Sequence, residues 1–482
     1  MSTARSRVPE FSAGLEWFNV DAPVRLAGQR GRIVLVCFCS FSDIPSQHVL
    51  ADMNYFASKY RKDLTVLGVH STRFPAEMRR SHVQKMMNKF HIRFPFVHDP
   101  ELKLCKRFGI RQWPTQVLAD RDGFIIGALA GDGKRARLKE VIEYQIKRES
   151  RFGSTGSEAY TVSQTPEPQA LLSFPGRVLV SRDRVYISDS AHNQVIITSA
   201  NGNILRRIGS TSPGFIDGDS LSAAFNNPQG MALGDQSLYV ADEGNHAIRC
   251  VNVRSGEVTT VAGTGTPGTV TGPVVTRPRE MQLKSPLDLV LVNGVLFIAM
   301  AGMHQVWSLS LIKNTIKVFS GSGREGLRDG SPNTAEFAQP SGLTVYGKSL
   351  YAVDAISSAI RCIDIDSGSV TTIAGSGCYE SGDQDGALSA AKLQYPMAIE
   401  ADMEHKMLWV SDTYNNKIRR VGIKTQHVSS VILDRKLDEP CGLAFHGGTL
   451  YIANTNAHEV LCLNPDSGRA EPLNVSEEHT HV

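Results

Sequence analysis

The chain has 482 residues, of which 41% are hydrophobic and 21% are charged. These proportions are typical of a soluble globular protein and exclude extensive disorder, and the length exceeds what one ordinary hydrophobic core holds, which indicates two or three domains. The net charge of +3 is unevenly distributed: residues 1–160 carry about 26 Lys and Arg against about 16 Asp and Glu, and the remainder is acidic.

The sequence shows neither a targeting segment nor a membrane segment. The first residues, MSTARSRVPEFSAGLEWF, lack the apolar core of a signal peptide, and no run approaches the ~18 apolar residues of a membrane-spanning helix. The eight cysteines are widely spread, which fits reduced and mostly buried thiols. We therefore expect a cytosolic protein without membrane attachment.

Apolar strands alternate with helical patterns up to about residue 150. After an N-terminal tail, residues 1–15, IVLVCFCSF predicts a strand, residues 43–60 a helix and LTVLGVHS a second strand. PAEMRRSHVQKMMNKF, residues 75–90, has a helical pattern, and PTQVLAD and GFIIGALAG predict a hairpin around an Asp-Gly turn. A last helix precedes a linker rich in Ser, Thr, Pro and Gly. The pattern indicates an α/β domain over residues 16–150 and a linker over residues 151–170.

A long repeat replaces the helical period from residue 171 on. Stretches such as LYVADEGNHAIRCVNVRSGEVTTVAG and LYAVDAISSAIRCIDIDSGSVTTIAG recur, each behind a proline. The prolines are about 44 to 58 residues apart, which fits six copies of four short strands. They are Pro175, Pro228, Pro286, Pro340, Pro396 and Pro440. The repeat predicts an all-β six-bladed propeller over residues 171–475 and a C-terminal tail over residues 476–482.

The elements P-x-G, Y-V-A-D and N-H-x-I-R recur in register and resemble the NHL-repeat family. The second strand of five copies ends in a short polar residue, which we expect to accept backbone N–H groups of the following turn. These residues are Asp189, Asp242, Asp354, Asp412 and Asn454, and the third copy has Met300 instead. His246, His304 and His458 share a slot with Asn or Ser, so we interpret them as hydrogen-bonding turn residues and predict no metal site.

Three arginines, Arg249, Arg361 and Arg419, lie three residues beyond that slot. Some NHL propellers bind RNA on a basic face, which makes these arginines a candidate binding surface. Their identical positions favour pairing with neighbouring blades, and the acidic balance of this half of the chain disfavours RNA. Cys250 and Cys362 also recur in one slot, which indicates packing.

Residues 16–146 resemble the thioredoxin-like superfamily. The resemblance rests on the RGRIVLVCF strand, the helix that follows it, the LTVLGVHS strand and the motif Trp113-Pro114-Thr115. It implies that Pro114 is cis and faces the redox site, and that Trp113 and Thr115 lie at a possible peptide-binding groove.

The order of the two domains resembles the family of NHL repeat-containing protein two. Members of that family typically continue into a further β-rich C-terminal domain, whereas this chain stops soon after its last blade. They also generally carry a Cys-x-x-C pair, which aligns with Asp43 and Ser46. Disulfide exchange needs a thiolate at the helix start and a second thiol one turn on. Asp43 and Ser46 preserve a good helix start but cannot carry out this exchange.

Two further thiols, Cys37 and Cys39, lie just upstream of this position. They face the same side of a strand that reads as buried on both faces, which favours core packing. A displaced redox or sensor role is the alternative.

We therefore predict a non-enzymatic interaction or scaffold protein that binds unidentified proteins or peptides, as a monomer and without a cofactor. The first alternative is a weak thiol-disulfide oxidoreductase or redox sensor that uses Cys37 or Cys39. The second alternative is an RNA-binding NHL propeller.

Overall fold

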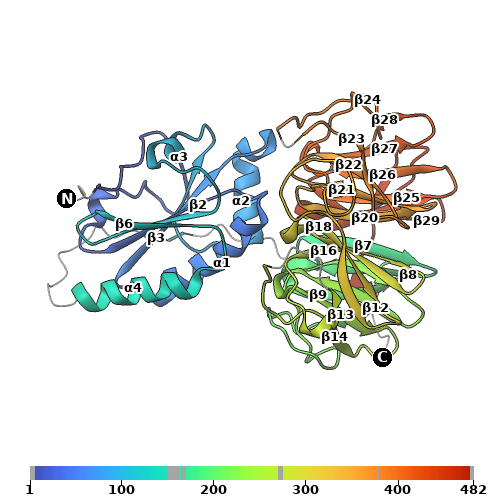
Figure 1. Ribbon diagram of the computed structural model, residues 1–482, viewed down its shortest axis with the longest axis horizontal. Coiled ribbons are helices and arrows are strands. Elements are labelled where there is room, and N and C mark those ends of the chain that lie inside the picture. The colour runs from blue at the N-terminus through green and yellow to red at the C-terminus, as the bar shows by residue number, and fades with distance from the viewer. Residues whose placement is uncertain (1–5, 150–161, 164–169, 270–274, 378, 478–482) are drawn as a thin grey trace. The chain divides into compact units, whose positions relative to one another are not determined.

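The computed structural model describes residues 6–149, 162–163, 170–269, 275–377 and 379–477. The chain divides into two compact units, residues 1–168 and 169–482. Figure 1 shows the first as an α/β unit in blue to cyan and the second as an all-β unit in green to red. Most of the predicted linker, residues 151–170, lies outside the described residues. No helix in the described ranges is long and apolar enough to cross a membrane.

The first unit is built on a six-stranded mixed sheet in the order β1, β4, β3, β2, β5, β6. Strands β2, β3 and β4 are parallel to one another, and the other three pair antiparallel with their neighbours. Their bounds are Glu16–Phe18 for β1, Ile33–Cys39 for β2, Leu64–Ser71 for β3, Phe96–Asp99 for β4, Thr115–Ala119 for β5 and Ile125–Ala130 for β6. The pairing of β5 with β6 confirms the predicted hairpin.

Side chains alternate along β2 between two hydrophobic cores. The odd-numbered residues from Ile33 to Cys39 join the core with α1 (Ile44–Lys59), α2 (Arg80–Lys89) and α4 (Arg135–Glu149). The even-numbered residues from Val34 to Phe38 join the core with α3 (Lys103–Phe108). All seven residues of β2 are buried, so the strand is covered on both faces, as the sequence predicts.

The helical pattern over residues 75–90 folds as two elements. A 3-10 turn, Pro75–Met78, ends at Arg79, which is extended with ψ 128°, and α2 begins at the next residue. The fully buried Glu77 accepts hydrogen bonds from the backbone N–H of Ser42 at 3.0 Å and of Phe74 at 3.1 Å. This anchor holds the turn against the loop before α1, and the helix starts only after it.

The second unit consists of six sheets, called blades 1 to 6 in chain order and each built on four antiparallel strands, which confirms the predicted propeller. Blade 1 contains β7 (Pro175–Ser181), β8 (Arg184–Asp189), β9 (Gln194–Ser199) and β10 (Asn203–Ile208). Blade 2 contains β11 (Pro228–Leu233), β12 (Ser237–Asp242), β13 (Ala247–Asn252) and β14 (Val258–Ala262). Blade 3 contains β16 (Pro286–Val292), β17 (Val295–Met300), β18 (Gln305–Ser310) and β19 (Thr315–Ser320). Blade 4 contains β20 (Pro340–Tyr346), β21 (Ser349–Asp354), β22 (Ala359–Asp364) and β23 (Val370–Ala374). Blade 5 contains β25 (Ala398–Asp402), β26 (Met407–Asp412), β27 (Lys417–Gly422) and β28 (His427–Ser430). Blade 6 contains β29 (Pro440–His446), β30 (Thr449–Asn454), β31 (Glu459–Leu463) and β32 (Ala470–Pro472).

Within the described residues, three blades carry a short fifth strand at the outer edge. These strands are β15 (Val275–Thr276), β24 (Gly386–Ala387) and β33 (Ser476–Glu477), on blades 3, 5 and 1. Strand β33 pairs parallel with β10, and Glu477 accepts a hydrogen bond from Arg207 at 2.6 Å. Residues 476 and 477, which the sequence assigns to a tail, thus belong to the sheet of blade 1.

One hydrogen bond repeats at all six junctions between blades. The acceptor is the residue at the repeat position of His246, and the donor is the backbone N–H of the residue before the next blade's proline. At the junction of blades 2 and 3, the Ser285 N–H donates to His246 Nδ1 at 3.1 Å. The other donor and acceptor pairs are Gln339 and His304, Phe174 and His458, Asn227 and Asn193, Tyr395 and Ser358, and Glu439 and Asn416. Imidazole, amide and hydroxyl groups serve as equivalent acceptors, which explains why these residue types exchange.

Candidate functional site

The position of the missing redox pair lies at the start of α1. Asp43 is the residue before the helix, and its carboxylate accepts hydrogen bonds from the Ser46 N–H at 2.9 Å and the Ser46 hydroxyl at 2.6 Å. Both side chains are buried. Such an N-cap stabilises a helix by about 0.5–2 kcal/mol. The two residues that replace thiols therefore satisfy each other and the helix start.

The Trp113-Pro114-Thr115 loop lies at the same edge of the sheet. Thr115 pairs with Phe38 at the end of β2, and the Trp113–Pro114 peptide bond is cis. The Thr115 side chain is buried and donates a hydrogen bond to the Gln112 carbonyl at 2.8 Å. Trp113 is partly buried against the core with α3. Of the binding surface predicted in this loop, Trp113 retains exposed area, whereas Thr115 retains little.

The two upstream thiols lie inside the core. Neither Cys37 nor Cys39 has exposed surface, and both belong to the core with α1. The neighbouring thiol of Cys37 and burial raise the pKa of Cys39 well above its usual range. Cys105 is also buried, and its sulfur lies 2.9 Å from the Ser71 hydroxyl. Burial also raises the pKa of Cys105, so Cys39 and Cys105 are held in the protonated, weakly nucleophilic form.

Three buried histidines lie together in this unit, and sequence reasoning missed them. His70 packs on Phe41 with ring centroids 4.5 Å apart, and the rings of His98 and His82 lie 5.4 Å and 6.5 Å from it. Burial, assisted by the two other histidines, lowers the pKa of His70 well below its usual value. Within the described ranges no group of three or more His, Cys, Asp or Glu side chains is arranged to hold a metal ion.

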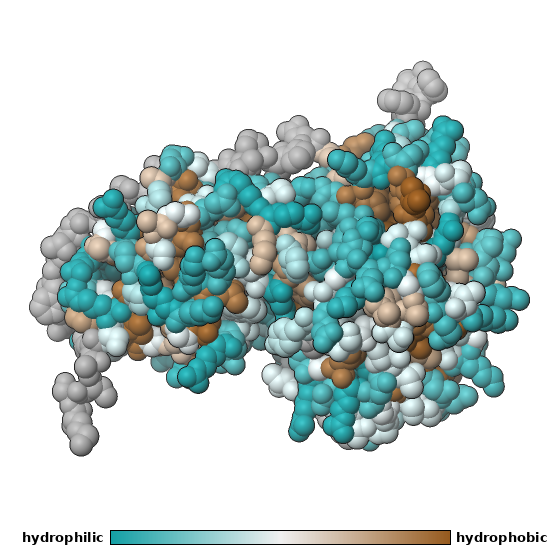
Figure 2. Space-filling model, turned by 90° about the horizontal axis from the view of Figure 1, so that it is seen from above, coloured by the Kyte–Doolittle hydropathy of each residue, from teal (hydrophilic) through white to brown (hydrophobic). Residues whose placement is uncertain are grey.

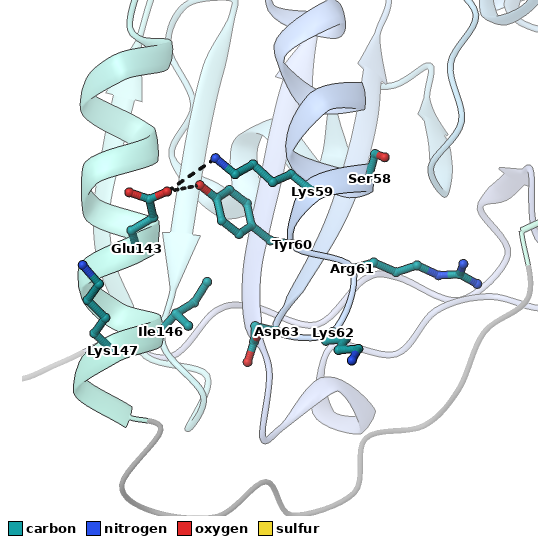
Figure 3. A pocket seen from close by; sticks show the side chains of 9 residues that line it. All are labelled: Ser58, Lys59, Tyr60, Arg61, Lys62, Asp63, Glu143, Ile146 and Lys147. Atoms are coloured by element: carbon teal, nitrogen blue, oxygen red, sulfur yellow. Dashed lines mark hydrogen bonds and ion pairs between the residues drawn. The ribbon is translucent and has the colours of Figure 1, made fainter.

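A hollow of about 560 Å³ separates the C-terminal end of α1 from α4 (Figure 3). Tyr60 donates a hydrogen bond to Glu143 at 2.6 Å, and Lys59 pairs with the same carboxylate at 3.5 Å. The basic residues that line the hollow are Lys59, Arg61, Lys62 and Lys147. An anion at this place would meet the negative end of the α1 dipole. The geometry therefore favours a contact that joins two helices over an anion site.

In the five blades whose second strand ends in a polar residue, that residue has a different backbone donor from the predicted one. Asp242 accepts a hydrogen bond at 2.8 Å from the N–H of Asn226, which lies in the segment before its own blade. The equivalent donor and acceptor pairs are Ser173 and Asp189, Ala338 and Asp354, Gln394 and Asp412, and Asp438 and Asn454. The sequence indicates the kind of contact, and the fold supplies the partner.

The three arginines considered for RNA binding are fully buried. Arg249 donates hydrogen bonds to Asp242 at 2.7 Å and to Asp217, the first residue of an Asp-Gly segment before blade 2, at 2.8 Å. The corresponding ion pairs join Arg361 to Asp354 and Asp329, and Arg419 to Asp412 and Asp385. The prediction of a binding surface at these arginines was wrong, because they have no exposed area. Their carboxylate partners come from the same blade and the segment before it, and not from a neighbouring blade.

Blade 3 lacks both charges of this arrangement. Met300 stands in the place of Asp242, and Trp307 stands in the place of Arg249. Both Met300 and Trp307 are fully buried in one hydrophobic cluster. A buried carboxylate without a partner is strongly destabilising, and blade 3 lacks both charges, whereas buried Asp189 of blade 1, which has Ile196 in the arginine position, pairs with His192 at 2.8 Å.

The central channel of the propeller holds a hollow of about 460 Å³, lined by residues from the innermost strand of every blade. Arg177 of blade 1 is among these lining residues and donates hydrogen bonds to the carbonyl oxygens of Ser341 at 2.7 Å, Met397 at 2.8 Å and Cys441. Asp288 Oδ1 lies 3.9 Å from Arg177 Nε. One side chain of blade 1 therefore contacts blades 3, 4, 5 and 6.

The third position of the P-x-G motif explains how the channel accommodates these groups. It holds Arg177 in blade 1, Asp288 in blade 3, Ala398 in blade 5 and glycine in the other blades. A Cβ atom at Gly230 would lie 2.3 Å from Asp288 Oδ1, and one at Gly442 would lie 2.7 Å from Arg177 Cα. The glycines leave the space that the two charged residues occupy. The sequence contained the information needed to find this pair, because only two copies of the motif have a charged residue at this position and the others have glycine or alanine.

The two units define a class of protein in which a thioredoxin-like domain without its redox pair precedes a six-bladed NHL propeller. Residues 31–125 match the family model for thioredoxin-like proteins, and residues 225–251 match the model for the NHL repeat.

Comparisons that span most of this chain agree with this class. The chain is 33% identical over 511 residues to NHL repeat-containing protein 2 of Gallus gallus, a match that covers 95% of this chain and 70% of that protein. Identity to the protein of the same name from Homo sapiens is 32%, with 94% and 69% covered. Identity to Protein SUPPRESSOR OF QUENCHING 1, chloroplastic, of Arabidopsis thaliana is 34%, with 93% and 46% covered. The chain belongs to the NHL repeat-containing protein 2 family.

Proposed function

We propose that this chain is a non-enzymatic interaction protein whose thioredoxin-like unit and propeller bind other proteins or peptides. The observation that carries the proposal is the 2.6 Å hydrogen bond from the Ser46 hydroxyl to Asp43 at the start of α1. A carboxylate and a hydroxyl form no mixed disulfide, so the geometry remains while the exchange chemistry is lost. Propellers present an extended surface for recognition, which suits a scaffold.

The exposed surface fits a protein that stays soluble between binding events. Among the described residues, large hydrophobic side chains with high exposure are spread over several segments, as with Leu221, Ile312 and Ile432, and the segment before blade 2 carries Phe215 and Ile216 as well as Leu221. The face in Figure 2 is mostly hydrophilic, with separate small hydrophobic patches. Patches of this kind suit reversible contacts better than a permanent hydrophobic interface.

The test is the reactivity of the thiols in the folded full-length chain. We expect iodoacetamide to leave Cys37 and Cys39 unlabelled in the native protein and to label both in denaturant, as read by peptide mass spectrometry. We also expect no reduction of insulin. Rapid native labelling of either thiol, together with insulin reduction that Cys37→Ser or Cys39→Ser abolishes, would instead establish the oxidoreductase alternative.

A matched variant isolates the cause. Asp43→Cys combined with Ser46→Cys returns the Cys-x-x-C spacing to the helix start, where the dipole favours a thiolate. Insulin reduction gained by this double variant would show that these two side chains account for the missing activity.

A further inference from the structure

One ionisable side chain in the propeller channel has no role in the contacts described so far. Glu400, on β25, lines the channel hollow and is partly exposed to it. The residues at the same position in the other innermost strands are uncharged: Leu179, Ala232, Val290, Thr344 and Ala444. A single carboxyl group therefore interrupts a neutral, mainly aliphatic ring.

No cation lies beside this carboxyl group in the part of the chain that the structure describes. The other ionisable side chains among the lining residues are Arg177 and Asp288. The Arg177 guanidinium is bonded to carbonyl oxygens of three blades and lies beside Asp288, so its charge is already compensated. Glu400 is thus a carboxyl group without a counter-ion among the described residues that line the channel, in a ring of mainly aliphatic side chains.

The channel walls desolvate Glu400 even though part of its surface is accessible from the hollow. This burial, together with the charge of Asp288, raises the pKa of Glu400 to about 8, although a hydrogen bond with the Phe445 backbone opposes the shift. The group is therefore mostly protonated at pH 7. A cation that entered the channel would supply the missing charge, and Glu400 would release its proton to solvent as the ion pair formed.

We propose that the channel binds an organic cation, an ammonium or guanidinium group on a short aliphatic stem, with Glu400 as its carboxylate partner. The stem would pack on the aliphatic walls, and the charged head would reach Glu400. A lysine or arginine side chain of a protein and a free alkylamine share this chemistry. A free amine can therefore be used to test the site without a protein partner.

The test compares n-butylammonium with n-butanol, its uncharged analogue, by calorimetric titration of the full-length chain. We expect n-butylammonium to bind at least about tenfold more tightly. Its affinity should rise about tenfold per pH unit below pH 8 and level off above it, because binding releases one proton while Glu400 is protonated. Titrations in buffers of different ionisation enthalpy measure that proton directly.

Variants identify the carboxylate. Glu400→Gln keeps the side-chain size and should weaken n-butylammonium binding at least about tenfold and remove its pH dependence. Glu404→Gln, on the exposed turn of the same hairpin, should change neither. The proposal is overturned if n-butylammonium does not bind, if n-butanol binds equally well, or if the wild-type affinity does not change with pH. The pH dependence of the wild-type affinity tests the proposal even if the Glu400→Gln variant does not fold.

A second pair of probes separates the sources of the cation. A short peptide with one central lysine is compared with the same peptide carrying norleucine. If the lysine peptide binds to the wild-type chain and Glu400→Gln abolishes this binding, the ligand is a protein side chain. Binding of n-butylammonium alone indicates a small amine.

Discussion

Asp242 and Arg249 form an ion pair of 2.7 Å in which neither side chain has exposed surface. Burial raises the pKa of Asp242 to about 6 even with the guanidinium beside it. The carboxyl group therefore depends on this partner for its charged state, and the pair is a structural unit of the blade.

Replacing Arg249 with methionine should destabilise the propeller by about 3–5 kcal/mol, because it leaves a buried carboxylate without a counter-charge. Adding Asp242→Met should recover part of this loss, since no unpaired charge then remains. The measurement is the denaturant midpoint of the propeller transition, with exposed Arg254→Met as the control. If the double variant were no more stable than Arg249→Met, pairing would not explain the effect.

Arg177→Lys should also destabilise the propeller, although the charge is kept. A lysine cannot place several N–H groups on carbonyl oxygens of different blades at once. Each charge-assisted hydrogen bond that is not replaced should cost about 1.5–3 kcal/mol. Thermal unfolding measures the loss, and Arg182→Lys, on the exposed turn after β7, is the matched control. Equal stability of the two variants would contradict a bridging role for Arg177.

The stability of the thioredoxin-like unit should fall in acid because of His70. Its pKa is lowered in the folded state, so the unfolded state binds more protons below about pH 6.5. Stability that is fully present above pH 6.5 is then lost as the pH falls, at up to about 1.4 kcal/mol per pH unit, until the pH passes the folded value.

Unfolding of the full-length chain at a series of pH values checks this dependence. His70→Phe, which preserves an aromatic ring beside Phe41, should reduce the slope below pH 6.5. His98, whose pKa burial also lowers, should account for part of the remaining slope. His91→Asn, at an exposed position with φ 48° that Asn tolerates, should leave the slope unchanged. An unchanged slope in His70→Phe would assign the acid sensitivity to other groups.

Local patterns were sufficient to predict both folds. The apolar pattern predicted β2, β3, β5, β6, α1 and α4 of the first unit but not the short elements β1, β4 and α3, and the recurrence of one phrase in register predicted the number of blades. The break at Arg79 was not predictable, because it follows from the contacts of Glu77 with Ser42 and Phe74. A helical period carries no information about such an anchor.

Contacts across long stretches of chain account for what was missed at the candidate sites. Nothing near Arg177 in the sequence indicates that its guanidinium meets carbonyl oxygens of blades 4, 5 and 6. The histidine cluster likewise has no motif, since the fold alone brings His70, His82 and His98 together. The joint change to Met300 and Trp307 was detectable, because the two positions change together in one copy of the repeat.

The contacts of Arg177 also bear on how the chain is made. This residue belongs to the first blade to leave the ribosome, yet its acceptors at Ser341, Met397 and Cys441 belong to the last three. A nascent chain thus holds a guanidinium without its carbonyl acceptors until blade 6 has been made, and the propeller closes only when blade 6 meets blade 1. Fragments that end before residue 440 should therefore be recognised by chaperones and proteases as incomplete, because the innermost strand of blade 1 has no neighbour on that side.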